Sequence, residues 1–286
     1  MTYRCMLLLL AVFAPEKFVN GLSLPTLCSR RSILASSIAA GSILCPQRGT
    51  AVPSSILSTS PFTEERDAGR DSAFAKTMSN GMKSYESAIA PKKTQLFDRL
   101  VRSLPSGSAV VVELGIGTFP NAPYYAMRDV GGEQRQLDII GVDPNASMER
   151  YARDAAANFG LDSVRVVQGV GEAIPLVDGC ADAVVCTLTL CSVKNPSAVL
   201  AEIRRVLKPG GKFLFVEHEL SPTNQGLASL QRTLSPLQVI SADGCHLDRS
   251  TLDTIRHAEF TQVDAEQFEL PGFLYLSSTA AGIATK

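Results

Sequence analysis

Two acidic residues and a glycine turn mark the stretch whose residue types and spacing could bind a nucleoside. Residues 111–121 read VVELGIGTFPN, in which Glu113 ends an apolar run and Gly115 and Gly117 follow it. Glycine tolerates the positive φ angles and the close backbone approach that a strand-to-helix turn over a ligand requires. A second apolar run ends at Asp143, at the spacing where a carboxylate accepts two hydrogen bonds from a ribose diol. The pattern indicates a nucleoside-binding βαβ unit.

Features around this turn favour a ligand with an amino group over a dinucleotide. The dinucleotide fingerprint needs glycine or alanine where this chain has Pro120, and proline removes a backbone N–H that a pyrophosphate would use. The Glu113 carboxylate would repel a pyrophosphate but suits an α-amino group. A P-loop is excluded because no Gly-Lys-Ser/Thr follows. S-adenosylmethionine carries both an amino group and a ribose diol, so it matches Glu113 and Asp143.

Regular alternation of strand and helix patterns surrounds these residues. Apolar runs bounded by turn residues predict strands at 109–114, 137–142, 164–168, 181–188, 213–217, 262–268 and 280–285. Amphipathic spacing predicts helices at 121–130, 147–159, 196–207, 227–239 and 251–257. Such alternation predicts one α/β domain, with a parallel sheet covered by helices on both faces.

Residues 73–104 precede the first strand and carry apolar residues at helical spacing. Gly81 and Pro91 interrupt this pattern, so we predict two helices. They would cover an edge of the sheet or, alternatively, form a lid in which Tyr85 contacts a ligand.

Composition and charge exclude several classes of protein. Of the 286 residues, 45% are hydrophobic and 19% charged, which is typical of a folded globular protein. The net charge is −1 and no basic run exceeds two residues, so we expect no nucleic-acid partner. The seven cysteines show no CxxC or Cys/His ligand spacing, so we expect free thiols and no metal.

The first 65 residues differ in kind from the rest and are expected to be a leader segment, with the domain spanning 66–286. Residues 6–14 (MLLLLAVFA) form an apolar run of signal-peptide length that is too short to span a bilayer. Residues 17–62 contain no acidic residue and are rich in serine and threonine, as organelle transit peptides are. A twin arginine at Arg30 and Arg31 precedes a second apolar run. We expect import into a plastid, with a thylakoid-associated or lumenal location included. The alternatives are secretion, mitochondrial import and anchoring in the endoplasmic reticulum membrane.

Four segments together resemble the class I S-adenosylmethionine-dependent methyltransferases, in the subgroup of the ubiquinone/menaquinone and sterol methyltransferases. They are 111–121, GVDPNASM (141–148), QGVGEAIPLVDGCADAVVCTLTL (168–190) and EIRRVLKPGGKFLFVEH (202–218). The resemblance implies a doubly wound, mostly parallel seven-stranded sheet with an antiparallel last strand. Two positions depart from the family pattern: Phe119 replaces its third glycine, and Val170 replaces a frequent aspartate.

The resemblance also implies S-adenosylmethionine as cofactor and a set of residues that bind it. Glu113 would bind the amino group, Gly115 and Gly117 the methionine moiety, and Asp143 the ribose. The full implied set is Glu113, Gly115, Gly117, Thr118, Asn121, Asp143, Pro144, Met148, Val170, Gly171, Glu172 and Thr187.

A narrower resemblance concerns the methyl acceptor. VVCTLTLCSVKNP (184–196), FVEHE (215–219) and ADGCHLDRST (242–251) are similar to segments of the methyltransferase-like 7 family, the thiol methyltransferases of animals, and of their plastid-directed plant relatives. This similarity implies a small, apolar acceptor, with a thiol as the preferred interpretation. Membrane association would be allowed but not required. The alternatives are a prenyl-quinone or other lipid methyltransferase, and a non-catalytic relative that only binds S-adenosylmethionine.

Candidates for acid–base chemistry follow the later strands, where folds of this class bind ligands. His218, at the end of the fifth strand, could take a proton at neutral pH or could instead anchor a loop. Asp243 and His246 lie in a loop that could close over the acceptor, although Asp-Gly is also a common turn. Because a thiol with a pKa of about 8.5 needs only modest help to ionise, a strong base is not required.

Overall fold

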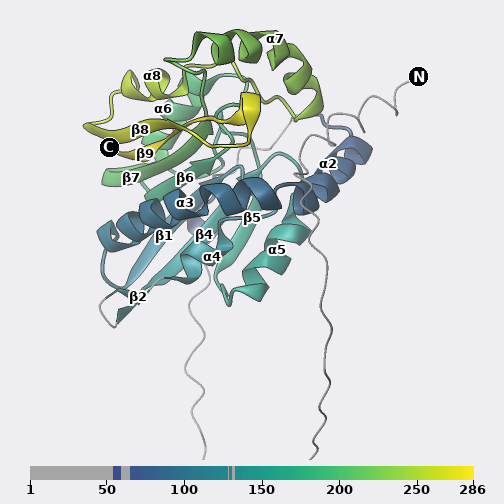
Figure 1. Cartoon of the computed structure of the whole chain (residues 1–286). Coiled ribbons are helices and arrows are strands. Elements are labelled where there is room, and N and C mark those ends of the chain that lie inside the picture. The colour runs from purple at the N-terminus through teal and green to yellow at the C-terminus, as the bar shows by residue number, and fades with distance from the viewer. Residues whose placement is uncertain (1–53, 59–64, 128, 131–132) are drawn as a thin grey trace, which may run out of the picture. The chain divides into compact units, whose positions relative to one another are not determined.

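The computed structural model describes residues 54–58, 65–127, 129–130 and 133–286 (Figure 1). Its centre is a seven-stranded sheet with the strand order β5-β4-β1-β6-β7-β9-β8. The strands are β1 (Ser108–Leu114), β4 (Gln136–Asp143), β5 (Val164–Gln168), β6 (Ala181–Thr187), β7 (Leu207–His218), β8 (Gln262–Glu269) and β9 (Ser278–Thr285). The pairs within β5-β4-β1-β6-β7 are parallel, whereas β9 is antiparallel to both of its neighbours. The expected mostly parallel sheet with an antiparallel last strand is confirmed.

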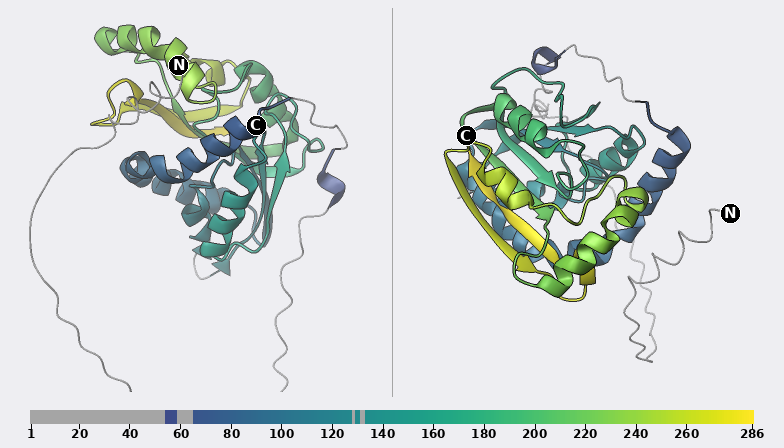
Figure 2. Two further views of the ribbon diagram at one scale, coloured as in Figure 1. Left: turned by 90° about the vertical axis from the view of Figure 1, so that its right-hand side faces the viewer. Right: turned by 90° about the horizontal axis from the view of Figure 1, so that it is seen from above.

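Helices cover both faces of this sheet, as the strand-helix alternation predicts (Figure 2). The helices are α2 (Ala68–Gly81), α3 (Lys83–Ser103), α4 (Ala122–Ala126), α5 (Met148–Asn158), α6 (Pro196–Val206), α7 (Gln225–Ser241) and α8 (Thr251–Arg256). Apolar side chains of α3, α4 and α5 pack on one face and those of α6 and α8 on the other. The strands β4 and β6 are buried along almost their whole length, and most of their residues are apolar, as expected for parallel strands covered on both faces.

Local sequence signals account for the ends of several helices. Before α6, the Asn195 side chain accepts a hydrogen bond from Ala198 N at 3.1 Å, and Pro196 takes the first helical position. Before α7, Asn224 accepts from Leu227 N at 3.0 Å. These caps place the loops that precede both helices at the same edge of the sheet as the glycine turn.

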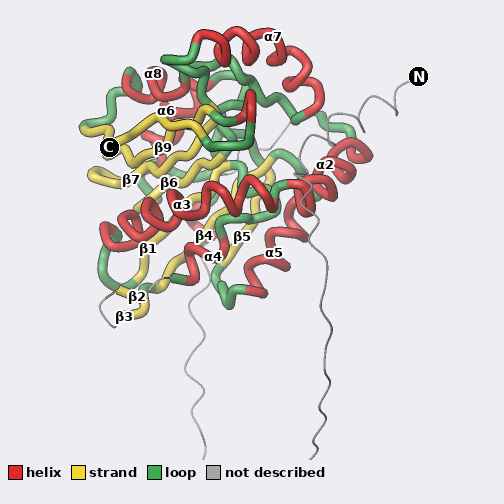
Figure 3. The backbone as a smooth tube through the Cα atoms, in the orientation of Figure 1, coloured by secondary structure: helices red, strands yellow, loops and turns green. Residues whose placement is uncertain are grey.

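Three expectations about local structure were wrong. Pro91 lies inside α3 and does not end it, because the carbonyl it leaves without a donor belongs to Ser87, which faces solvent. The helix α3 lies across a face of the sheet and not along an edge (Figure 3). The helix expected at 121–130 stops at Ala126, and a short hairpin of β2 (Asp129–Val130) and β3 (Glu133–Gln134) follows.

A short segment before the domain also makes described contacts. The 3₁₀ turn η2 (Ser54–Ile56) leads into Leu57, which forms a β-bridge with Leu176. Ser58 N donates to Pro175 O and Val177 N donates to Ile56 O, both at 3.0 Å. The rest of the expected leader, residues 1–53 and 59–64, lies outside the described residues. Within the described part, no helix combines the length and apolar character needed to cross a membrane.

Candidate active site

The glycine turn after β1 packs tightly against two neighbouring loops. Gly115 has φ +66° and donates from its N–H to Val142 O at 2.7 Å, which ties the turn to the end of β4. A Cβ at Gly115 would lie 2.2 Å from Thr189 Oγ1, so a side chain here would collide with the loop after β6. Gly117 has φ +53°, and a Cβ on it would have only a distant neighbour at 3.9 Å. The first glycine is therefore required by packing, and the second by backbone conformation.

Phe119, which replaces the third glycine of the family motif, also has a left-handed backbone conformation, at φ +60°. Its side chain is buried in the core beneath the turn, with its ring centroid 5.7 Å from that of Tyr125. Thr118 is only partly buried between Gly117 and Phe119. The large side chain at position 119 thus fills the core while its backbone keeps a glycine-like conformation.

Asp143 ends β4 directly beside this turn and is buried. Its Oδ2 accepts from Gly117 N and its Oδ1 from Asn145 N, both at 2.9 Å. Burial raises the pKa of Asp143 to about 6, although these two N–H groups oppose the shift. Each carboxylate oxygen keeps a lone pair for a further donor. The position and remaining capacity of Asp143 fit a ribose diol.

Glu113 is fully buried at the end of β1. Its two oxygens accept hydrogen bonds from Asn121 Nδ2 and Tyr125 Oη. Burial raises the pKa of Glu113 to about 7, and the charge of Lys93 counteracts part of this shift. Asn121 Nδ2 also donates to Thr187 Oγ1 at 3.0 Å.

An acceptor atom next to Glu113 has no partner. Among the described residues, Asn121 Oδ1 is buried and accepts no hydrogen bond. An ammonium group bound here could donate to it and be attracted by the Glu113 carboxylate. The site therefore fits the amino group of S-adenosylmethionine, while direct contact between that group and Glu113 stays a prediction.

The residues expected around the adenine lie at the ends of β4 and β5. Pro144 O accepts from Gln168 Nε2 at 3.0 Å, and Met148 is buried at the start of α5. The following loop, residues 170–172, bends through a β-bridge between Val170 and Ala173. A Cβ on Gly171 would lie 3.0 Å from Val199, and Glu172 Oε1 accepts from Asn195 N at 3.0 Å. All twelve expected donor-binding residues thus lie at the carboxyl edge of the parallel strands or in the turns that follow.

The loop after β6 is held in place by a buried acid. Glu217, at the end of β7, is fully buried, and its carboxylate accepts from Thr189 N at 3.0 Å and Cys191 N at 3.3 Å. Burial raises the pKa of Glu217. Leu188, at the start of this loop, has φ +54°. The hydrogen bonds of Glu217 identify it as a loop anchor.

The three acid–base candidates gather around one loop but face different partners. His218 is buried, and its Nδ1 lies 3.4 Å from Cys245 Sγ. Asp243 pairs with Arg66 at 2.9 Å, and His246 Nδ1 lies 3.6 Å from Asp248 Oδ1. Burial lowers the pKa of His246. The structure brings the candidates together without joining them into a proton relay, and their role as bases stays a prediction.

Arg66 was not anticipated from the sequence and connects two distant elements. It pairs with Asp71 of α2 at 2.8 Å and with Asp243 at 2.9 Å. Asp71 O in turn accepts from Asn145 Nδ2 at 3.0 Å, next to Asp143. No sequence motif indicates this connection, because 177 positions separate Arg66 from Asp243.

Lys93 was also missed, although the sequence contains a signal for it. It is fully buried on α3, and its Nζ pairs with Glu86 Oε2 at 2.7 Å. Lys93 lies four residues from both Ile89 and Phe97, so it occupies the apolar stripe of its helix. A lysine in such a stripe requires a charged partner, which the fold supplies in Glu86 and, more distantly, Glu113.

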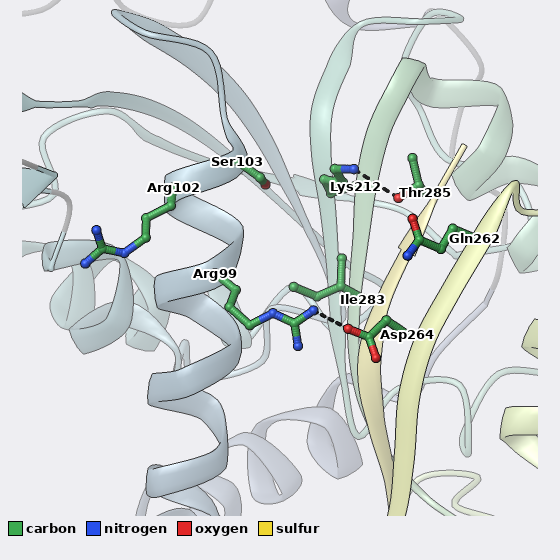
Figure 4. Close-up of a pocket in the computed structure, with 8 residues that line it drawn as sticks. All are labelled: Arg99, Arg102, Ser103, Lys212, Gln262, Asp264, Ile283 and Thr285. Atoms are coloured by element: carbon green, nitrogen blue, oxygen red, sulfur yellow. Dashed lines mark hydrogen bonds and ion pairs between the residues drawn. The ribbon is translucent and has the colours of Figure 1, made fainter.

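A pocket lined by side chains of α3, β7, β8 and β9 lies away from the carboxyl edge of the parallel strands (Figure 4). This pocket has a volume of about 430 Å³ and lies between the end of α3 and the amino ends of β7 and β8. Its lining residues are Arg99, Arg102, Ser103, Lys212, Gln262, Asp264, Ile283 and Thr285. Its position separates it from every residue expected to bind the methyl donor.

Comparison with known proteins agrees with the geometry. Residues 112–215 match the family model described as "Methyltransferase domain". The thiol S-methyltransferase TMT1B of Rattus norvegicus is 36% identical over 198 residues, which cover 68% of this chain and 77% of the relative. The thiol S-methyltransferase TMT1A of Homo sapiens is 34% identical over 190 residues, covering 65% of this chain and 75% of the relative.

Solved structures share the fold at low sequence identity. Geranyl diphosphate methyltransferase, solved with GPP and sinefungin, aligns with a TM-score of 0.53 at 15% identity over 68% of this chain and 77% of that chain. The resemblance inferred from the motifs is confirmed, and with it S-adenosylmethionine as the cofactor. When bound, this cofactor supplies an electrophilic methyl group, which the protein must orient and shield from water. The chain belongs to the S-adenosylmethionine-dependent methyltransferases.

Proposed function

We propose that this enzyme transfers the methyl group of S-adenosylmethionine to the sulfur of a small, apolar thiol. The observation that carries the proposal is the character of the site at the ends of β6 and β7. The nucleoside-binding residues occupy the ends of β1, β4 and β5, so the acceptor must approach beside the neighbouring strand ends. There the structure presents a buried, mainly apolar environment and one imidazole.

The apolar character comes from a small cluster that is separate from the main core. Its buried members are Cys191, Cys245, Leu247 and Leu276, and partly buried Leu234, Ala242, Phe273 and Tyr275 pack against them. The ring of Tyr85 meets those of His218 and Phe273 edge-on, with centroids 5.8 and 5.3 Å apart. Such surroundings favour an apolar acceptor and keep water from the reacting atoms.

The protonation chemistry also supports a thiol. His218 Nε2 is buried without a hydrogen-bond partner among the described residues, and its other nitrogen faces a cysteine and not a carboxylate. A hydroxyl or carbon acceptor would need a stronger base than this arrangement offers. A thiol ionises far more readily, and its thiolate is an effective nucleophile in an in-line displacement. In the transfer, the acceptor sulfur bonds to the methyl carbon, the sulfonium bond breaks, and the thiol proton leaves to solvent. The two relatives named thiol S-methyltransferases add support.

A direct comparison of acceptors tests the proposal. The purified enzyme is given methyl-labelled S-adenosylmethionine with phenylmethanethiol, with benzyl alcohol, or with a short-chain prenylated quinol, and the products are identified by mass spectrometry. We expect the methyl thioether alone, and no product from Asp143→Ala. Methylation of the quinol without the thiol would replace the proposal with a lipid methyltransferase. Binding of S-adenosylhomocysteine without turnover of any acceptor would indicate a non-catalytic relative.

A further inference from the structure

Three metal-ligating side chains from separate parts of the chain meet in the apolar cluster. Cys191 follows β6, His218 ends β7, and Cys245 lies between α7 and α8. All three are buried, with exposed fractions of 1%, 7% and 5%. One ligand atom from each lies within 4.8 Å of the other two, and His218 Nδ1 is 3.4 Å from Cys245 Sγ. We refer to these residues as the Cys191–His218–Cys245 cluster.

The spacing suits a tetrahedral zinc ion. With Zn–S bonds of about 2.3 Å and Zn–N bonds of about 2.0–2.1 Å, neighbouring ligand atoms lie about 3.6–3.8 Å apart. The observed N···S separation of 3.4 Å is close to this value. Two thiolates and an imidazole form a soft ligand set that selects Zn²⁺ over Mg²⁺ or Ca²⁺. A set of three protein ligands also leaves the fourth position open, as in catalytic zinc sites.

The backbone around the cluster is fixed by hydrogen bonds. Cys191 N donates to Glu217, and Cys191 O accepts from His246 N at 2.8 Å, which holds the two cysteine-bearing loops together. A Cβ on Gly244 would lie 2.7 Å from Ser192 O, so only glycine permits this approach. The cysteines are therefore held close before any metal binds.

Charge in the surroundings also favours a zinc–dithiolate. Such a centre is neutral when its fourth ligand is neutral and carries one net negative charge when the fourth ligand is a thiolate. Arg249 donates from Nη1 to Leu190 O at 2.6 Å and interacts electrostatically with Cys191 and Cys245. A bound cation would displace the protons of both thiols, because the thiolate is the metal ligand.

We propose that the Cys191–His218–Cys245 cluster binds Zn²⁺ and that the open fourth position takes the sulfur of the acceptor thiol. The second half of this inference rests on the proposed function. Coordination would release the acceptor proton to solvent and hold the thiolate at the acceptor side of the site. The thiolate sulfur then bonds to the methyl carbon as the sulfonium bond breaks, giving a methyl thioether and S-adenosylhomocysteine. The neutral thioether is a weak zinc ligand and leaves.

This inference reverses our expectation from the sequence that no metal is bound. That expectation relied on spacing along the chain, and a site built from three separate loops has no local spacing to detect. It also gives His218 the role of ligand in place of base.

Metal binding is measured first, independently of activity. The full chain, with Cys5, Cys28 and Cys45 replaced by serine, is reduced, freed of metal and titrated with Co²⁺, and then with Zn²⁺ against a chromophoric chelator. We expect one equivalent bound, with a thiolate-to-cobalt charge-transfer band. Cys191→Ser, Cys245→Ser and His218→Ala should each weaken binding by about 100-fold or more. Cys180→Ser is the matched control, because this buried thiol lies outside the cluster, and it should bind like the parent.

Circular dichroism of each metal-free variant shows whether it folds. The proposal fails if no stoichiometric binding occurs, or if folded Cys191→Ser binds as the parent does. It also fails if native protein holds a Cys191–Cys245 disulfide and takes up no metal after reduction.

The acceptor role is tested on the cobalt protein. Phenylmethanethiol should change its charge-transfer spectrum, and benzyl alcohol should not. Metal binding without any methylation of thiols would retain the site and refute the proposed function. Equal thiol methylation by metal-free and zinc-loaded enzyme would refute the acceptor role of the metal. Calorimetry with S-adenosylhomocysteine checks the donor site in each preparation.

Discussion

Phe119 combines a strained backbone with a well-packed side chain. A non-glycine residue at φ +60° costs of order 1 kcal/mol, whereas its buried ring contributes packing energy to the core. The sequence identified the substitution for glycine but could not show where the ring points. The ring lies in the core, and the backbone at position 119 keeps the left-handed conformation that a glycine adopts readily.

Replacing Phe119 with glycine separates these two effects. We expect Phe119→Gly to lower the free energy of unfolding by about 2–4 kcal/mol, because the cavity outweighs the relief of strain. Affinity for S-adenosylhomocysteine should change by less than about threefold, since the ring faces away from the turn. Urea unfolding and calorimetry measure the two quantities. Phe159→Gly, at an exposed position, is the control and should unfold much like wild type. A large change in donor affinity with little loss of stability would contradict this assignment.

The two buried acids of the donor site predict a pH dependence of donor binding. Burial raises the pKa of Glu113 to about 7 and that of Asp143 to about 6. Only the ionised carboxylates attract an ammonium group and accept from ribose hydroxyls. We therefore expect affinity for S-adenosylhomocysteine to fall about tenfold or more between pH 8 and pH 6. Calorimetry at several pH values measures this, and a flat profile would refute the assignment.

Two substitutions, and the dependence of the free energy of unfolding on pH, distinguish weakened donor binding from acid unfolding. Glu113→Gln should flatten the profile between pH 6 and 8, and Asp143→Asn should flatten its more acidic part. The stability contributed by these groups changes in the opposite direction, because burial raises both pKa values above those of the same side chains in the unfolded chain. That contribution is complete below the unfolded-state pKa values and is lost as the pH rises through 6 and 7. As the pH rises, the affinity for the donor should therefore increase, while the contribution of Glu113 and Asp143 to the free energy of unfolding decreases.

At the scale of elements, the carboxyl edge is closed by contacts between segments far apart in sequence. Arg66 joins α2 to the loop at Asp243, and Gly244 packs on the loop after β6. The strand-helix pattern predicted every strand of the central sheet, because most are distinct apolar runs and β8 alternates polar and apolar residues over much of its length. It could not predict these contacts, which depend on how loops fold back over the sheet.

Removing the Arg66 side chain should make the loop around Asp243 more mobile, because the ion pair that joins this loop to α2 is lost. Its ion pairs are partly exposed, so we expect Arg66→Ala to weaken S-adenosylhomocysteine binding by about two- to fivefold. The amides of Gly244, Cys245 and His246 should exchange faster with solvent, as measured by hydrogen–deuterium exchange. Arg99→Ala is the matched control because it breaks an ion pair with Asp264, away from the carboxyl edge of the parallel strands. Equal effects of the two variants would show that Arg66 is an ordinary surface residue.

At the scale of the whole molecule, the sequence was most informative about the protein family. It was least informative about sites whose residues come from distant parts of the chain. The donor-binding residues follow one another in local motifs, so their placement at one edge of the sheet was predictable. Lys93 was detectable as a charge in an apolar stripe. The Cys191–His218–Cys245 cluster was not, because its members share no motif and approach one another only through the tertiary fold.

The expected N-terminal leader leads to a prediction about where the chain is cleaved. We propose that the N-terminal segment directs import into a plastid, on the basis of its composition. Because Ile56 and Leu57 pack against the core and pair with residues 176–177, we propose that the mature domain begins before residue 56, ahead of the expected boundary at residue 65. N-terminal sequencing of the native protein should therefore find a mature chain that begins before Ile56.

Truncated chains test the same point in vitro. A chain that starts at residue 65 should have a free energy of unfolding about 1–3 kcal/mol lower than that of a chain that starts at residue 50, because it lacks the partly buried side chains of Ile56 and Leu57. Equal stability of the two, or a native N-terminus after Leu57, would restore the original boundary.

The left-handed residues also provide a guide for protein engineering. Among the described residues, five other than glycine have positive φ, and three of them, Phe119, Leu188 and Asp243, lie at the active site. Of the other two, both exposed, Leu274 lies between Phe273 and Tyr275 of the apolar cluster, whereas Glu259 is remote from the site. Exchanging Glu259 for glycine or asparagine should raise the melting temperature through about 0.5–1 kcal/mol of relieved strain, with turnover unchanged. Stabilisation of this enzyme should therefore start far from the site, where strain has no role in ligand binding.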